Sequence, residues 1–140
     1  MGGALHFLMG YALVHRLDAT GVALSVFFGL VFAAGHLNQE VRDHESDRAN
    51  GIRTSAVVHG CRASFLASFA LFSAAYALLA GLAAAGVLPR LLLVAGPVWV
   101  LQAWLAREAL RRGLDVHTAL WMQQRYRLLF AVVGLALLVR

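Results

Sequence analysis

The sequence predicts an all-α protein, a polytopic bundle of transmembrane helices. Hydrophobic residues make up 61% of the 140 positions, and the mean hydropathy of +0.72 is too apolar for a soluble domain of this size. The apolar residues also fall in long runs separated by short polar connections, which is typical of membrane-spanning helices. We therefore treat residues 1–140 as a single transmembrane domain.

The elements follow from the apolar runs in order. The run 4–15 is shorter than the roughly 20 residues that cross a hydrocarbon core, so it is expected to be the end of a longer helix. The later runs predict spans at about 19–38, 63–87, 91–106 and 118–139. Pro97 is expected to kink the third of these, because proline removes a backbone donor. Between the first two spans, a polar loop is expected over 39–62, with Asn50-Gly51 as a turn.

The basic residues indicate orientation rather than nucleic-acid binding. All 12 are arginine, which excludes chemistry that needs a lysine. One side of the predicted membrane carries Arg42, Arg48, Arg53, Arg62, Arg107, Arg111, Arg112, Arg125 and Arg127, and the other carries Arg16, Arg90 and Arg140. The positive-inside rule then places the loop at 39–62 on the cytoplasmic side of the cell inner membrane. The single cysteine, Cys61, excludes an internal disulfide or a Cys-Cys metal site.

Four of the seven acidic residues lie within eight positions, directly after an apolar run. They are Glu40, Asp43, Glu45 and Asp47. If the preceding helix continues, Glu40, Asp43 and Asp47 share one of its faces, where like charges repel unless a cation binds between them. Hard oxygen ligands of this kind suit magnesium or calcium. His36 lies one turn earlier on the same face, where packing or support of a ligand is favoured over direct metal binding.

Arginines are interleaved with these carboxylates. The guanidinium groups of Arg42, Arg48 and Arg53 have the geometry to hold phosphate oxygens. Carboxylates that bind a metal beside arginines that bind phosphate describe a diphosphate site. The alternative is a solvated loop of alternating charge, which is what most charged runs are.

The run from Glu40 to Gly60 resembles the second aspartate-rich motif of the UbiA-type intramembrane prenyltransferases. Asp43 and Asp47 match the aspartate pair of that motif, and Gly51-Ile52-Arg53-Thr54 matches its following loop. Glu40 stands where the family has Asn or Asp, and Gln39 replaces the more usual Asn before it. The stretch 5–10 also looks like the helix that precedes the motif in the family.

This resemblance implies both a reaction and a set of roles. Members transfer a prenyl group from a prenyl diphosphate to an acceptor, often an aromatic ring or quinone precursor, with Mg²⁺ as cofactor. Asp43 and Asp47 would be the catalytic metal ligands, assisted by Glu40, while Arg42, Arg48 and Arg53 would bind the diphosphate. The family's first aspartate motif is not in this sequence. The chain is therefore expected to represent about half of such a fold, a fragment lacking an amino-terminal half or a half that pairs with a partner chain.

Other functions remain open from the sequence. The chain could be a non-catalytic membrane protein that binds a polyprenyl lipid or partner helices. The DxxDGxxAR core of the CDP-alcohol phosphotransferases is absent, and no charged residue interrupts the middle of a span as a transport relay would. Near the start of the last span, Gln123, Gln124 and Arg127 are polar enough to face a cavity, or alternatively to contact lipid headgroups.

Overall fold

The computed structural model describes residues 2–138, and every regular element in this range is helical. The helices are α1 (Gly2–Val14), α2 (Ala19–Ala49), α3 (Ser55–His59), α4 (Cys61–Ala84), the 3₁₀ helix η1 (Arg90–Val94), α5 (Ala95–Arg112) and α6 (Val116–Leu138). The predicted all-α class is confirmed.

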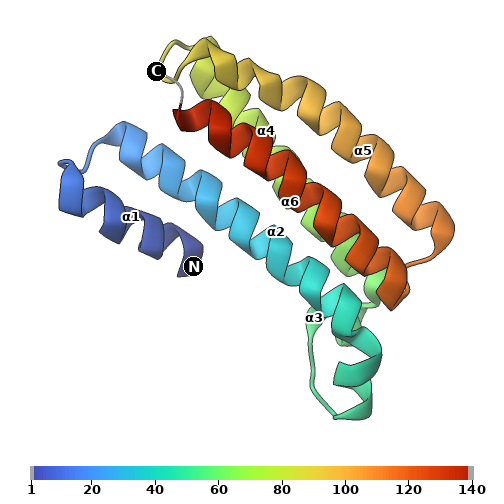
Figure 1. Cartoon of the computed structure of the whole chain (residues 1–140). Coiled ribbons are helices and arrows are strands. Elements are labelled where there is room, and N and C mark those ends of the chain that lie inside the picture. Colours follow the sequence, from blue (N-terminus) through green and yellow to red (C-terminus); the bar gives the residue numbers. More distant parts are fainter. Residues whose placement is uncertain (1, 139–140) are drawn as a thin grey trace.

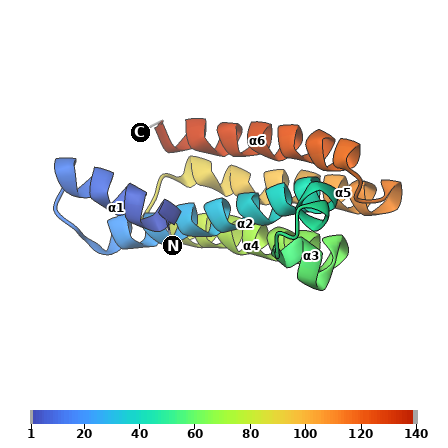
Figure 2. The same cartoon turned by 90° about the horizontal axis from the view of Figure 1, so that it is seen from below.

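The long helices α2, α4, α5 and α6 run up and down in chain order, and α1 lies along the first part of α2 (Figure 1). Both α2 and α5 pack against α4 and α6, so the four form a closed bundle. Figure 2 shows α6 lying along one side of the other helices. Because each helix reverses the direction of the one before it, the end of α2, the start of α4, the end of α5 and the start of α6 meet at one end of the bundle.

Aromatic and small residues fill the core of this bundle. Phe72 of α4 and Phe130 of α6 have ring centroids 5.0 Å apart. Ala34 of α2 is fully buried, which allows α2 and α4 to approach closely. Polar groups at the contact are paired: the Asn38 amide donates to the Ser68 hydroxyl, which itself donates to the Ala34 carbonyl oxygen at 2.8 Å. Such interhelical hydrogen bonds are typical of helices packed in a membrane.

The expected loop at 39–62 is mostly helical, which corrects the prediction. The second helix continues to Ala49, and α3 and the start of α4 occupy most of the remainder. The helix ends in a Schellman motif, in which the backbone N–H of Ile52 donates to the carbonyl oxygen of Asp47 at 2.8 Å. Gly51 supplies the left-handed conformation that this ending needs, with φ of 70°. The helix ends at the Asn-Gly turn, where the backbone N–H groups of Gly51 and Ile52 bond the last carbonyl oxygens of α2.

Three helical segments of the described residues are long and apolar enough to cross a membrane: Ala19–Ala49, Cys61–Ala84 and Arg90–Arg112. They contain the first three predicted spans, apart from the last residues of the second. The fourth, predicted at 118–139, is the helix α6, whose first half is too polar to join this group; position 139 lies outside the described residues. Helix α1 is 13 residues long and, as predicted for 4–15, too short to span. The protein is a helical membrane bundle.

Pro97 lies inside the third apolar segment, near the start of its α-helical part. The predicted span at 91–106 begins as the 3₁₀ helix η1, and the α-helix α5 starts at Ala95. Pro97 is therefore in the first turn of α5, where its missing N–H has no helical partner to lose. The change from 3₁₀ helix to α-helix falls two residues before Pro97, at Ala95.

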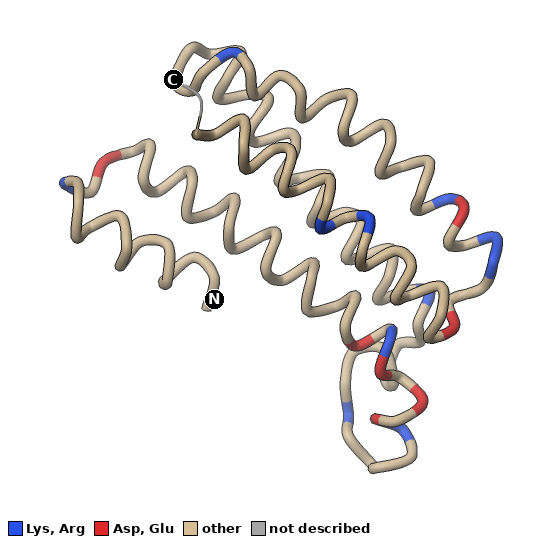
Figure 3. Tube along the Cα trace, viewed as in Figure 1, with Lys and Arg blue, Asp and Glu red and all other residues tan. Residues whose placement is uncertain are grey.

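Charged residues gather at the end of the bundle where α2 ends and α6 begins (Figure 3). The opposite end carries Arg16, Asp18 and Arg90, while Arg140 lies outside the described residues. The uneven distribution of charged residues that the sequence predicted is thus a difference in charge between the two ends of the bundle.

Candidate functional site

The carboxylate stripe, which we define as Glu40, Asp43 and Asp47, lies near the end of α2. Helix α2 is continuous through all three residues, so they share the face expected from their spacing. All three are partly exposed, whereas Asn38 and Val41 on another face of α2 are buried. The same helix therefore packs with one face and presents carboxylates with another.

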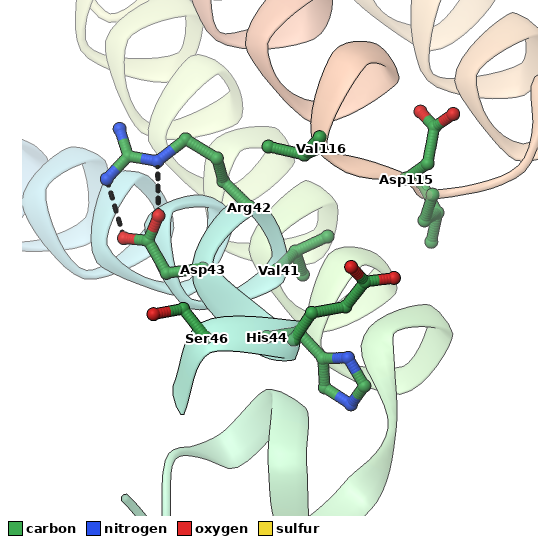
Figure 4. Close-up of a pocket in the computed structure, with 9 residues that line it drawn as sticks. Val41, Arg42, Asp43, His44, Ser46, Asp115 and Val116 are labelled. Carbon is green, nitrogen blue, oxygen red and sulfur yellow. Dashed lines mark hydrogen bonds and ion pairs between the residues drawn. The ribbon is translucent and has the colours of Figure 1, made fainter. Parts of the chain in front are cut away.

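Asp43 is held by its neighbour Arg42 in a two-pronged ion pair. The Arg42 Nε donates to Asp43 Oδ1 at 2.7 Å, and Nη2 donates to Oδ2 at 2.6 Å (Figure 4). The remaining nitrogen, Nη1, donates to Gln123 Oε1 of α6 at 3.2 Å. The guanidinium group is thus fixed by three hydrogen bonds, and it fixes the orientation of Asp43 in turn.

Glu40 has a different partner. Its Oε2 accepts a hydrogen bond from the backbone N–H of Ser55, the first residue of α3, at 2.8 Å. Its other oxygen, Oε1, lies 3.6 Å from Nε2 of His36, the residue one turn earlier. A carboxylate at a helix start stabilises the unpaired N–H groups there, although a helix as short as α3 has a small dipole. Glu40 therefore ties α2 to the segment after the Asn-Gly turn.

The described residues do not bring three His, Cys, Asp or Glu side chains together as a metal site. The donor chemistry still fits Mg²⁺, because Asp43 and Asp47 are hard oxygen ligands one turn apart on one face. In the part of the chain that the structure describes, Asp47 makes no side-chain hydrogen bond or ion pair, so both of its oxygens are available. Asp43 would have to exchange its bonds to Arg42 for a metal bond.

Two cavities open beside the carboxylate stripe. One, of about 250 Å³, lies between the end of α2 and the start of α6 and is lined by Arg42, Asp43, Asp115 and Val116 among others (Figure 4). The other, of about 410 Å³, lies between α1, α2 and α3 and is lined by Phe32, His36, Glu40 and Ser55 among others. The stripe thus borders two cavities, each lined by both polar and apolar residues.

The three predicted phosphate-binding arginines are in different environments. Arg42 is half-buried and oriented as described above, whereas Arg48 and Arg53 are exposed on either side of the Asn-Gly turn. Within the described residues neither Arg48 nor Arg53 is in an ion pair. Arg48 lies in the last turn of α2 and Arg53 just before α3, so both are close in sequence to Asp47.

The polar start of α6 contributes Gln123 to the site. The sequence indicated it only as one of three polar residues that could face a cavity. Gln123 is 4% exposed and contacts Arg42, while Gln124 and Arg127 are exposed. The second amide atom of Gln123, Nε2, is buried without a hydrogen-bond partner among the described residues. The contact joins residues 81 positions apart, and no local pattern in the sequence indicates it.

Asp115 was missed as a site residue. It precedes α6 and lines the same cavity as Asp43, and its Oδ1 accepts a hydrogen bond from the Thr118 backbone N–H at 2.7 Å. That N–H stabilises the charged carboxylate and lowers the pKa of Asp115 below its ordinary value. An aspartate directly before the start of a helix was the available signal, since Asp is a preferred N-cap residue.

Comparison with known proteins supports the resemblance seen in the motif. Residues 1–130 match the model of the UbiA prenyltransferase family. No curated protein and no solved structure matches the chain. The match covers nearly the whole sequence, including every residue of the carboxylate stripe and the polar start of α6. The chain belongs to the UbiA prenyltransferase family, whose general reaction is prenyl transfer in a membrane.

Proposed function

We propose that this chain binds the diphosphate of a prenyl diphosphate and takes part in Mg²⁺-dependent transfer of the prenyl group to an acceptor within the membrane. The observation that carries the proposal is the arrangement of Arg42, Asp43 and Asp47 at the charged end of an apolar helical bundle. Charged ligands for a diphosphate and an apolar surface for a prenyl chain then lie along one helix, α2.

The chemistry divides between these two regions. The bond between the allylic carbon and the diphosphate oxygen breaks, and its electron pair leaves with the diphosphate. The prenyl cation then bonds to an electron-rich atom of the acceptor, which loses a proton. When bound, Mg²⁺ supplies positive charge that stabilises the leaving diphosphate. Asp43 and Asp47 would hold it, with Glu40 as a further candidate ligand.

The arginines have complementary roles in this proposal. Arg42 is the oriented one, and Gln123 is a positioning residue that keeps its guanidinium group in place. Arg48 and Arg53 are exposed and unpaired among the described residues, so they are available to contact phosphate oxygens without breaking an existing ion pair. The apolar helices would exclude water from the cation.

We further propose that a second helical segment, from the same polypeptide or from a partner chain, completes the site. Two observations support this. The described carboxylates do not form a three-ligand metal site, and the exposed apolar residues of α1 include Leu5, Met9 and Leu13. Further carboxylates and a cover for α1 would both come from that segment. The charged end would face the cytoplasm by the positive-inside rule.

The test is consumption of a prenyl diphosphate by the native polypeptide in membranes, followed as Mg²⁺-dependent release of diphosphate. We expect release with the unaltered protein and its loss in Asp43→Asn. The intact mass of the native polypeptide, measured first, shows whether the upstream segment belongs to the same chain, since this sequence alone accounts for 15.1 kDa.

The alternative function is that of a non-catalytic membrane protein that binds a polyprenyl lipid or partner helices. Binding of prenyl diphosphate without any release of diphosphate, in a preparation whose mass and partners are established, would favour it over catalysis.

A further inference from the structure

The hairpin between α5 and α6 carries two arginines on one tryptophan ring. The guanidinium carbon of Arg112 lies 4.6 Å from the centroid of the Trp121 ring, and that of Arg125 lies 4.1 Å from it. Both distances are within the range of favourable cation–π contacts. We call Arg112, Trp121 and Arg125 the basic–aromatic cluster.

Positive charge exceeds negative charge at this cluster. Glu108 is the one carboxylate that pairs with it in the described residues, through Arg112 Nε at 2.9 Å, and the same carboxylate lies 4.0 Å from Arg111. Arg125 instead donates to the backbone carbonyl oxygen of Trp121 at 3.0 Å. Among the described residues, Arg111 and Arg112 therefore share one carboxylate and Arg125 pairs with none, which leaves donors and net positive charge for an anion.

The cluster lies at the level of the carboxylate stripe. Gln123, two residues after Trp121, contacts Arg42 of α2, so Trp121 is at least as close to the charged end of the bundle. Arg125 belongs to a deeper turn of α6, but its side chain runs back toward Trp121, as basic side chains do when they reach for a membrane surface. Tryptophan is itself enriched at that surface.

We propose that the basic–aromatic cluster binds the phosphate headgroup of an anionic glycerophospholipid. The Trp121 ring holds the two guanidinium groups in fixed positions, and their N–H donors suit phosphate oxygens. A zwitterionic headgroup carries an ammonium group that the surplus arginine charge would repel. This proposal does not depend on prenyl transfer, because none of the three residues belongs to the carboxylate stripe or contacts it.

The experiment uses Trp121 fluorescence in lipid nanodiscs. The native polypeptide carries Trp99→Phe and Trp104→Phe, along with replacement of any tryptophan outside this sequence, so that Trp121 alone reports. A small fraction of lipid with brominated acyl chains, either phosphatidylglycerol or phosphatidylcholine, is added to otherwise phosphatidylcholine discs. We expect the phosphatidylglycerol form to quench Trp121 several times more strongly.

The double variant Arg112→Gln with Arg125→Gln should bring this quenching ratio close to one. Taking the ratio within each variant removes the direct effect of the arginines on the fluorescence. Arg62→Gln, a change of the same kind at the same end of the bundle, should leave the ratio as it was, and thermal unfolding should show each variant folded. Equal quenching by the two lipids, or an unchanged ratio in the double variant, would overturn the proposal.

A final arm distinguishes the lipid from a soluble phosphate ligand. Sodium pyrophosphate and sodium chloride are added at equal ionic strength. The lipid assignment predicts the same small decrease of the ratio in both. Selective loss of the phosphatidylglycerol preference with pyrophosphate would show that the cluster takes a free diphosphate, and the lipid assignment would be wrong.

Discussion

The two sides of α2 differ in what they contact. On one side, Phe27, Ala34 and Val41 are at most 3% exposed and pack into the bundle. On the other, Phe32 is 63% exposed, and the carboxylate stripe continues the same line of residues toward the charged end. The packed side places α2 in the bundle, whereas the open side faces the short helices α1 and α3 and carries the carboxylates. This difference means that stability and activity should respond to different substitutions in one helix.

The largest expected effect is a loss of activity after a substitution on the open side of α2. Asp43→Asn removes the charge of a proposed Mg²⁺ ligand while keeping a similar shape, and diphosphate release should fall about 100-fold or more, as when one preorganised electrostatic group is lost from an active site. Asp18→Asn is the matched control, because it makes the same change at the opposite end of the bundle and asparagine is an equally good helix cap. Full turnover in Asp43→Asn would contradict the proposed role.

Substitutions on the packed side of α2 should lower the stability of the protein. Ala34→Leu places three additional carbon atoms where α2 meets α4, and such overpacking typically costs about 1–3 kcal/mol. Phe32→Leu, on the open side, should change stability by less than about 0.5 kcal/mol. Unfolding of both variants in detergent tests the contrast. Equal losses would mean that the open side of α2 is covered in the native protein.

The contact between Arg42 and Gln123 links α2 to α6 beside the carboxylate stripe. Gln123→Leu leaves Nη1 of Arg42 without its acceptor, and the loss of about 0.5–1.5 kcal/mol predicts a decrease in kcat of about 2- to 10-fold. Gln124→Leu, on the exposed face of α6, is the control. If Gln123 serves only packing, its leucine variant should be less stable with kcat unchanged.

A smaller effect is expected from Glu40. In Glu40→Ala the backbone N–H of Ser55 loses its acceptor, so the turn between α2 and α3 should open more often. Trypsin should then cleave after Arg53 several times faster than in the unaltered protein. Glu45→Ala provides an exposed carboxylate of the same helix for comparison. Unchanged cleavage would show that Glu40 does not hold α3 in place.

The smallest effect concerns pH and Asp115. Because its pKa is lowered in the folded protein, its contribution to stability is present above the unfolded value and is lost as pH falls through the folded value. The midpoint temperature of thermal unfolding of the native protein should therefore fall slightly on acidification below about pH 4. Asp115→Asn keeps a capping oxygen without the charge and should decline less. Parallel profiles for the two proteins would contradict this assignment.

Much of the architecture could be predicted because it depends on local sequence. Long apolar runs predicted the helices, and the spacing of Glu40, Asp43 and Asp47 predicted a shared face if α2 continued. The loop prediction failed because a charged helix end resembles a loop in composition; the Schellman ending at Gly51 sets the boundary. The start of the α-helix α5 at Ala95 was not predicted, because the 3₁₀ segment before it belongs to the same apolar run.

The contacts of the site could not be predicted in the same way. The bond of Arg42 to Gln123 and the bond of Glu40 to the start of α3 depend on how separate helices meet. Alternation of charge also cannot show whether Arg42 pairs with Asp43 or turns to a ligand. The types of residue in the site were therefore predictable, but their partners were not.

The length of α2 has a further consequence. At about 1.5 Å per residue its 31 residues extend about 46 Å, well beyond the roughly 30 Å of a hydrocarbon core. Asp43 lies 24 positions after Ala19, or about 36 Å along the axis. If α2 enters the hydrocarbon near Ala19 with little tilt, its carboxylates stand in the headgroup layer while the preceding turns remain in lipid. Because α2 is one uninterrupted helix longer than the hydrocarbon core, it can contact the charged part of an amphiphile in the headgroup layer and its apolar part within the hydrocarbon.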